Sequence, residues 1–208
     1  MAAGRELQAE ERHRELLAVA DGEDFADLDK LGFLQTGLED KQGRQVVLVI
    51  AKLYPAKVLQ RDRVLRYFCR KVHAVAEAPY SLVWLHSTAT YWENCPSALW
   101  MWRTWDSLPA HYRTNLVAMH VLHCDLNLWT AALCLGPWLS GGLWRKVNWV
   151  SRVEFLWDVL DKAALLPRLP EFVCEHDGVL EEQPLADYGI VAQTGLTAGL
   201  PGGVAPPL

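Results

Sequence analysis

Three apolar runs dominate this chain, and segments of a different periodicity separate them. VVLVIAK at 46–52, YSLVWLH at 80–86 and NLVAMHVLH at 115–123 carry apolar residues almost continuously, not at every second position. Such runs are typical of strands that are covered on both faces, as in parallel sheets. Between them, residues 57–77 repeat apolar side chains at helical spacing, and 97–108 begins at a serine cap. This alternation predicts an α/β fold with a mostly parallel sheet.

The remaining segments are shorter or less regular. Residues 5–20 predict a charged helix, 24–38 a mixture of short helix and loop, and 40–44 a turn. WRKVNWV at 144–150 predicts a fourth, shorter strand. Residues 165–177 contain two prolines and predict mostly extended chain.

Composition narrows the classes of protein to consider. A formal net charge of -5 argues against a nucleic-acid binder, because phosphate binding needs excess lysine and arginine. The five cysteines are odd in number and include no CxxC pair, which favours a reducing compartment. The N-terminus has no apolar signal region, and no stretch has the length of a membrane span. We therefore expect a cytoplasmic protein that can also contact membranes peripherally.

The stretch LVAMHVLHCDLNLW gathers polar groups that resemble a metal or catalytic cluster: His120, His123, Cys124 and Asp125. On a strand, His120 and His123 point to opposite faces, so the cluster does not converge on a metal. His123 and His86 both end strands, where open α/β sheets bind ligands, so both are candidate ligand-binding residues. No metal, cofactor or enzymatic activity is predicted, because GxSxG, GxGxxG and GxxxxGK[ST] are all absent.

The segment 126–144 is apolar on almost every side of its expected helix, 126–135, which Asp125 is placed to cap. A helix of this kind is either buried deep in the core or covers an apolar ligand or a membrane. Its tryptophans favour a boundary, since an indole N–H needs a polar partner. A second surface feature is the row Arg63, Arg66 and Arg70 on the polar side of 57–77, a candidate contact for a partner or for lipid headgroups.

Five segments in order resemble the CRAL-TRIO lipid-binding domain, and in particular its divergent branch, which occurs in Rho GTPase-activating and macro-domain proteins. They are DKQGRQVVLVIAKLYP (40–55), YSLVWLHS (80–87), HYRTNLVAMHVLHCD (111–125), GPWLSGGLWRKVNWVSRVEFLWDVL (136–160) and LPRLPEFVCEHD (166–177). The resemblance implies a five-stranded sheet with helices on one face, and a gate helix over an apolar cavity on the other. It implies no catalytic residues.

The resemblance also implies where a ligand contacts the chain. The expected wall consists of Val83 or Trp84 together with Met119 and Val121. Val83 and Trp84 are alternatives because both faces of the strand are apolar and either could line the cavity. The gate residues are Trp129, Leu133 and Trp138. Members of the family bind phosphoinositides, other phospholipids or small hydrophobic molecules, and members of the divergent branch bind small GTPases and self-associate.

Three parts are expected: an N-terminal helical extension at 1–39, the CRAL-TRIO-like domain at 40–178 and a disordered tail at 179–208. The expected function is non-enzymatic binding of a phospholipid or another hydrophobic ligand near membranes. The alternative is an interaction scaffold with a closed cavity that binds a small GTPase or itself.

Overall fold

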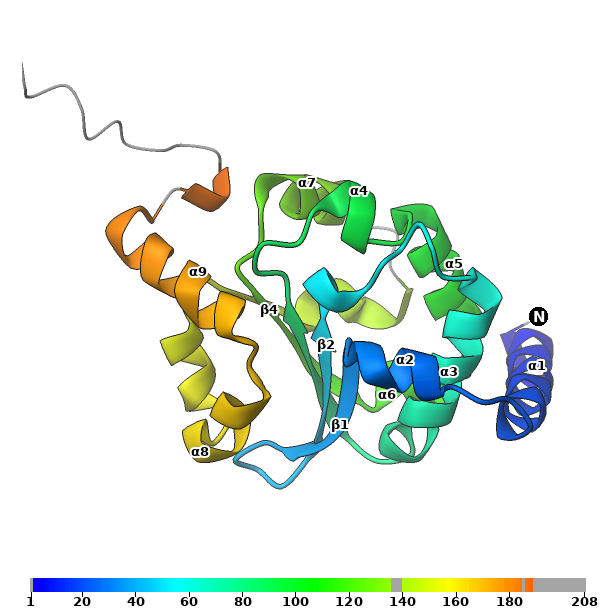
Figure 1. Cartoon of the computed structure of the whole chain (residues 1–208). Helices are drawn as coiled ribbons and strands as arrows, with labels where there is room; N and C mark the ends of the chain where they lie inside the picture. Colours follow the sequence, from blue (N-terminus) through cyan, green and yellow to red (C-terminus); the bar gives the residue numbers. More distant parts are fainter. Residues whose placement is uncertain (1, 136–139, 185, 189–208) are drawn as a thin grey trace, which may run out of the picture.

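A five-stranded sheet forms the centre of the computed structural model, which describes residues 2–135, 140–184 and 186–188 (Figure 1). Its strands are β1 (Leu34–Glu39), β2 (Gln45–Ile50), β3 (Tyr80–Leu85), β4 (Leu116–Leu122) and β5 (Val147–Val150), side by side in that order. β1 is antiparallel to β2, and the other neighbours are parallel. The predicted α/β fold with a mostly parallel five-stranded sheet is confirmed.

The strand order places every connection between parallel strands on one side, which we call the crossover face. The strands follow one another across the sheet in a single direction, and right-handed connections then all fall on the same face. The helices of this layer are α3 (Arg61–Ala76), α4 (Tyr91–Asn94), α5 (Ala98–Ser107), α6 (Ala110–Thr114), α7 (Leu126–Leu135) and the 3-10 segments η1 (Ala51–Leu53) and η3 (Ser140–Lys146). The first two helices, α1 (Ala2–Asp21) and α2 (Ala26–Leu31), lie on the same side (Figure 1).

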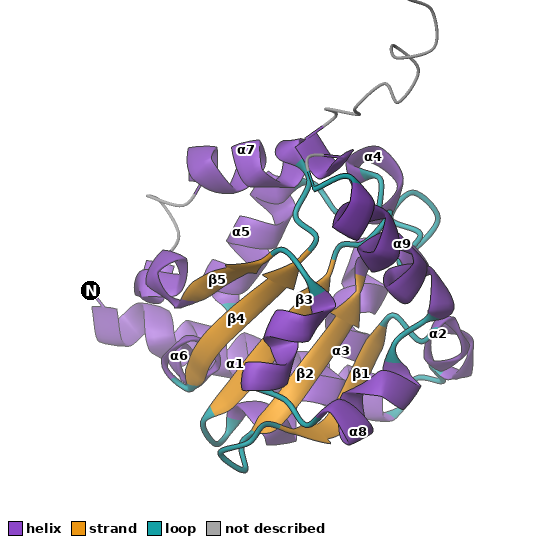
Figure 2. Cartoon of the chain, turned by 90° about the vertical axis from the view of Figure 1, so that its left-hand side faces the viewer, coloured by secondary structure: helices purple, strands orange, loops and turns teal. Residues whose placement is uncertain are grey.

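The opposite side, the return face, is covered by the chain that follows β5. This layer consists of η4 (Val153–Asp158), α8 (Lys162–Leu165), η5 (Leu166–Arg168) and α9 (Glu171–Glu182), with η6 (Ala186–Tyr188) beyond it (Figure 2). Strand residues such as Val83 and Leu122 pack there against Leu156, Leu160 and Val173, all of them buried. Helices therefore cover both faces of the sheet, as continuously apolar strands require.

Two segments differ from their sequence-based expectations. Residues 34–39, expected to be helix and loop within the N-terminal extension, form β1. The signal was weak because LQTGLE holds no β-branched residue except Thr36, and because its pairing with β2 shifts between Gln35 and Leu38, beside Gly37 at a φ of 79°. The boundary at 39/40 therefore cuts through the sheet.

Residues 165–177, expected to be extended, are helical instead. Pro167 lies in the first turn of η5, and Pro170 directly precedes α9. At the start of a helix a backbone N–H has no acceptor within the helix, so proline is tolerated there. The two prolines are therefore compatible with helices that begin at these positions. α9 continues to Glu182, and residues 189–208 of the expected tail lie outside the described part of the chain.

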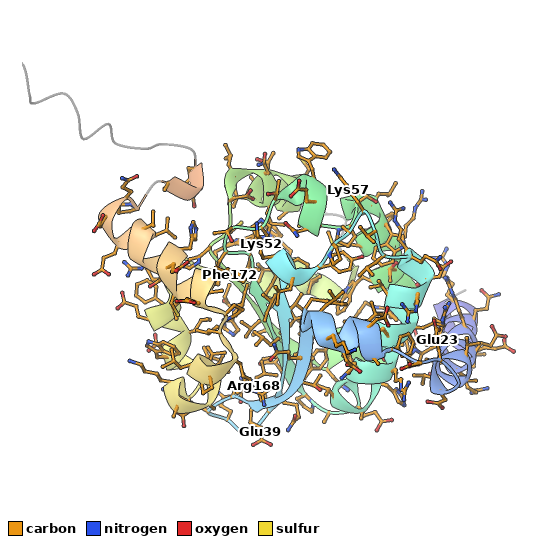
Figure 3. The ribbon with its side chains drawn as sticks, viewed as in Figure 1. Glu23, Glu39, Lys52, Lys57, Arg168 and Phe172 are labelled. Carbon is orange, nitrogen blue, oxygen red and sulfur yellow. The ribbon has the colours of Figure 1, made fainter. Side chains whose placement is uncertain are left out.

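The arginine row on α3 binds the chain's own N-terminal segment. Arg63 lies 3.0 Å from Glu23 and 2.6 Å from Asp27, and Arg66 lies 2.6 Å from Glu23. Arg70 donates to the backbone carbonyls of Ala20 and Glu23. Glu23 lies between α1 and α3 in Figure 3. The row that was a candidate contact for a partner or for lipid headgroups is thus paired with the acidic segment after α1.

Asp177 of α9 joins the return layer to the carboxyl end of β4. Its carboxylate accepts hydrogen bonds from the Val153 N–H at 2.7 Å and from Arg152 Nε at 3.2 Å, and it lies 3.0 Å from His123 Nε2. The other ring nitrogen of His123 lies 2.7 Å from Ser87 Oγ. Burial opposes ionisation of Asp177, but these hydrogen bonds outweigh it and lower the pKa of the carboxyl group.

This arrangement predicts that Asp177→Ala lowers the free energy of unfolding by about 2–4 kcal/mol, since it leaves buried donors without an acceptor. Urea denaturation followed by circular dichroism measures the change. The matched control is Glu181→Ala, which removes another carboxylate from Arg152 but one whose side chain is 72% exposed. We expect its unfolding midpoint to stay near that of the wild type. Equal midpoints for both variants would contradict the role given to Asp177.

Candidate functional site

An apolar cavity of about 320 Å³ lies between the crossover face and the helices above it. Strands contribute Val49, Leu82, Trp84, Met119, Val121, Val147 and Trp149, and α3 contributes Val64, Leu65 and Phe68. The α5 side is formed mainly by indole rings, those of Trp100, Trp102 and Trp105. This volume is at the lower end of the range of small-molecule sites, about 300–1,000 Å³.

The register of the sheet decides which strand face lines the cavity. Val49 pairs with Trp84, and Trp84 pairs with Val121, so their side chains point to the same side. All three line the cavity, as does Met119. Val83 is packed in the return layer instead. Of the wall residues named from the sequence, the structure therefore brings together Trp84, Met119 and Val121.

Helix α7 closes one side of the cavity, and its inner surface differs from the expected one. Asp125 caps the helix as predicted, with its Oδ1 accepting from the Leu128 N–H at 2.7 Å. The residues that line the cavity are Leu128, Ala131 and Ala132.

The expected gate residues Trp129 and Leu133 lie on the other side of α7, 39% and 41% exposed. Helical spacing puts residues 128, 131 and 132 on one face and turns 129 and 133 away from it. The sequence-based choice favoured the larger side chains, whereas the small side chains of Ala131 and Ala132 face the cavity. The third expected gate residue, Trp138, lies outside the described residues.

Two residues of the cavity wall carry polar atoms that the sequence analysis did not identify. The hydroxyl group of Tyr54 and Nε1 of Trp105 are buried, and neither has a hydrogen-bond partner among the described residues. Burial raises the pKa of Tyr54, so the hydroxyl group keeps its proton. A buried donor without an acceptor is costly, by about 1–3 kcal/mol. Each is a donor that the described residues leave without an acceptor.

The two strand-end histidines, His86 and His123, are 1% exposed, and neither lines the cavity. His86 accepts a hydrogen bond of 3.4 Å from Trp84 Nε1, and its Nε2 lies 3.3 Å from Asp125 Oδ1. His86 thus joins the end of β3 to the start of α7.

His123 was expected to point to the face opposite His120. A left-handed backbone, with a φ of 52°, interrupts the strand alternation at His123. The side chain consequently reaches Asp177 of the return layer, the side on which His120 also lies.

Ser87, His123 and Asp177 form a hydrogen-bonded chain of the same residue types as the catalytic triad of serine proteases. Here the serine lies at Nδ1 and the aspartate at Nε2, the reverse of the arrangement in serine proteases. Ser87 is 0% exposed, and none of the three residues lines the cavity. A substrate has no described route to the serine oxygen, and the chain of hydrogen bonds joins β3, β4 and α9.

Within the described residues, none of the helices combines the length and the hydrophobicity that crossing a bilayer requires.

Comparison with known proteins bears on the same region. Residues 43–178 match the family model of the divergent CRAL/TRIO domain. The chain is 26% identical to Protein GDAP2 homolog of Drosophila melanogaster over 173 residues, which are 82% of this chain and 31% of that protein. It is 25% identical to Rho GTPase-activating protein gacY of Dictyostelium discoideum, covering 84% of this chain and 24% of that one.

A third relative, Rho GTPase-activating protein 68F of Drosophila melanogaster, is 28% identical over 73% of this chain and 30% of its own length. The chain thus spans about a third or less of the relatives that it matches. The family match covers well over half of the 208 residues and includes β2 to β5, the cavity wall on α3, α5 and α7, and most of α9. This chain belongs to the divergent CRAL/TRIO domain family.

Proposed function

We propose that this chain is a non-enzymatic module that binds a phospholipid or another small hydrophobic molecule in the cavity on the crossover face. The observation that carries the proposal is an apolar cavity of about 320 Å³ between the sheet and α3, α5 and α7. Burial of apolar ligand surface there contributes roughly 25 cal/mol per Å². The family supports the same class of ligand.

The polar atoms in the wall narrow the chemistry of the ligand. Tyr54 and Trp105 each offer a buried N–H or O–H donor without an acceptor among the described residues. A pure hydrocarbon leaves both donors unsatisfied, whereas an ester, carboxyl or hydroxyl oxygen satisfies them. The proposed ligand therefore has a long apolar part and at least one acceptor oxygen that is buried with it.

The outer side of α7 supports loading from a membrane surface. Leu126, Trp129 and Leu133 are 46%, 39% and 41% exposed on the helix whose inner side lines the cavity. Apolar side chains on one outward surface, with an indole among them, suit the boundary between headgroups and acyl chains. Trp129 and Leu133 are then membrane contacts of a cytoplasmic protein, and not cavity residues.

A second candidate function is protein interaction, which the names of two relatives suggest because they are Rho GTPase-activating proteins. Contact with a small GTPase, or self-association, stays a prediction for this chain. The arginine row supports neither kind of protein contact, since Arg63, Arg66 and Arg70 bind the N-terminal segment. Replacing these arginines would therefore change the attachment of α1 as well as any contact with a partner.

The two sides of α7 are expected to behave differently when they are altered. Ala132→Phe fills the cavity and should reduce retained lipid at least tenfold, measured by native mass spectrometry of the freshly purified chain followed by lipid extraction. Leu133→Asp changes the exposed side and should keep the retained lipid while slowing its exchange with vesicles. If the wild type carries no lipid and takes none from mixed vesicles, the proposed function is wrong. If Ala132→Phe retains as much as the wild type, the assignment of the cavity is wrong.

Tyr54→Phe separates the polar part of the ligand from its apolar part. In the ligand-free chain, the change removes a buried hydroxyl group without a partner, so the free energy of unfolding should rise by about 1 kcal/mol. Affinity for a fatty acid or phospholipid should fall about threefold to tenfold, at a net 0.5–1.5 kcal/mol for one hydrogen bond. Affinity for an alkane of the same length should not fall. Calorimetry with both probes measures the difference, and an equal loss for both would contradict the role of the hydroxyl group.

A further inference from the structure

Three histidines from three helices meet on the side of α3 that faces away from the cavity. His13 comes from α1, His73 from α3 and His111 from the first turn of α6. One ring nitrogen of each lies within 4.8 Å of the other two. His13 is 6% exposed, and the other two histidines are half-buried. The cluster lies at the α1–α3 interface. His13 is about 60 positions from His73 and about 100 positions from α6 in the sequence.

Two ring nitrogens of the cluster, Nδ1 of His13 and Nε2 of His111, are buried without a hydrogen-bond partner among the described residues. Nε2 of His13 lies 3.3 Å from Nδ1 of His73 and 3.3 Å from the Tyr112 hydroxyl group. Ring packing alone would not require three imidazoles, since phenylalanine packs equally well and buries no polar atom.

We propose that His13, His73 and His111 bind a Zn²⁺ ion that fastens α1 to the domain. Neutral imidazoles are preferred ligands of Zn²⁺, with Zn–N distances of about 2.0–2.1 Å and tetrahedral geometry. In a tetrahedron of that size two ligand nitrogens are about 3.4 Å apart. The 3.3 Å between His13 Nε2 and His73 Nδ1 fits this value, and rotation of the side chains closes the wider separations of up to 4.8 Å.

A carboxylate lies where an outer partner of a zinc ligand is expected. Nε2 of His73, the nitrogen that faces away from His13, lies 3.5 Å from Glu77 Oε1 one helical turn along α3. Metal-binding histidines commonly donate their second N–H to a carboxylate, which orients the ring and raises its basicity. Three imidazoles leave the fourth position of the ion to a water molecule.

The position of the cluster gives the metal a structural purpose. α1 has charged residues along most of its length. Leu16, Leu17 and Ala20 pack against the core near its C-terminal end, whereas Leu7 is 67% exposed. Its C-terminal end is held by Arg70, and Glu6 near its N-terminal end accepts from the Ala110 N–H. His13 lies midway between these contacts, where a metal would hold the centre of the helix.

The test uses the full chain after treatment with a chelator, titrated with Zn²⁺ in a calorimeter. The wild type should bind one equivalent. Glu77→Gln should weaken the affinity about 10–100-fold, as loss of an outer partner does, and His13→Gln, His73→Gln or His111→Gln should weaken it further. His176→Gln, a histidine outside the cluster, is the matched control and should bind as the wild type does. Zn²⁺ should raise the Tm of the wild type and of His176→Gln, but not that of His13→Gln.

A second measurement on the unaltered chain separates histidine ligands from cysteine ligands. Co²⁺ in place of Zn²⁺ should show the visible bands of a four-coordinate ion without a charge-transfer band from thiolate. Circular dichroism establishes that each variant is folded, and the half-exposed His111 serves if His13→Gln does not fold. Absence of stoichiometric binding, equal affinity in the cluster variants, or a thiolate band would each overturn the proposal.

Discussion

The handedness of the connections between parallel strands is the constraint on which the rest of this structure depends. Strands β2 to β5 follow one another in a single direction, so all their connections lie on the crossover face. The other face of these strands is equally apolar and must be covered by the chain after β5. That chain is a series of short helical segments, and the buried hydrogen bonds of Asp177 hold it to the end of β4. The cavity and this attachment are therefore consequences of one topology, on opposite sides of the sheet.

The same topology explains why the crossover face retains a cavity. Three connections share that face. The one between β3 and β4 contributes the large indole rings of α5, and the one between β4 and β5 contributes the alanines of α7. Opening a cavity costs about 24 cal/mol per Å³ in protein cores, which for a volume of this size is on the order of several kcal/mol. Such a cost is large against a total stability of about 5–15 kcal/mol. The ligand proposed above would offset this cost by filling the volume and by accepting hydrogen bonds from Tyr54 and Trp105.

Elements whose residues follow a local pattern were predicted correctly from the sequence. Features that depend on tertiary contacts were not. The buried strands β2, β3 and β4, the helices α1, α3, α5 and α7, and the Asp125 cap follow from periodicity and capping. β1 was missed because only its pairing with β2 makes LQTGLE a strand. The inner side of α7 was misassigned because hydropathy is high all round that helix, and only the assembled fold decides which side faces the cavity. Tyr54 and Trp105 carry no local signal at all, since an absent partner is a property of the assembled fold.

α3 connects the cavity with the N-terminal helix. Val64, Leu65 and Phe68 line the cavity from one side of α3, while Arg63, Arg66, Arg70 and His73 contact α1 and the segment after it from the other. A helix moves as a rigid element, so a displacement that changes one of these interfaces changes the other. Binding of the proposed ligand and docking of α1 would then bias the same element, and by thermodynamic linkage any coupling between them is reciprocal. The polar N-terminal helix is thus one packed helix away from the apolar cavity.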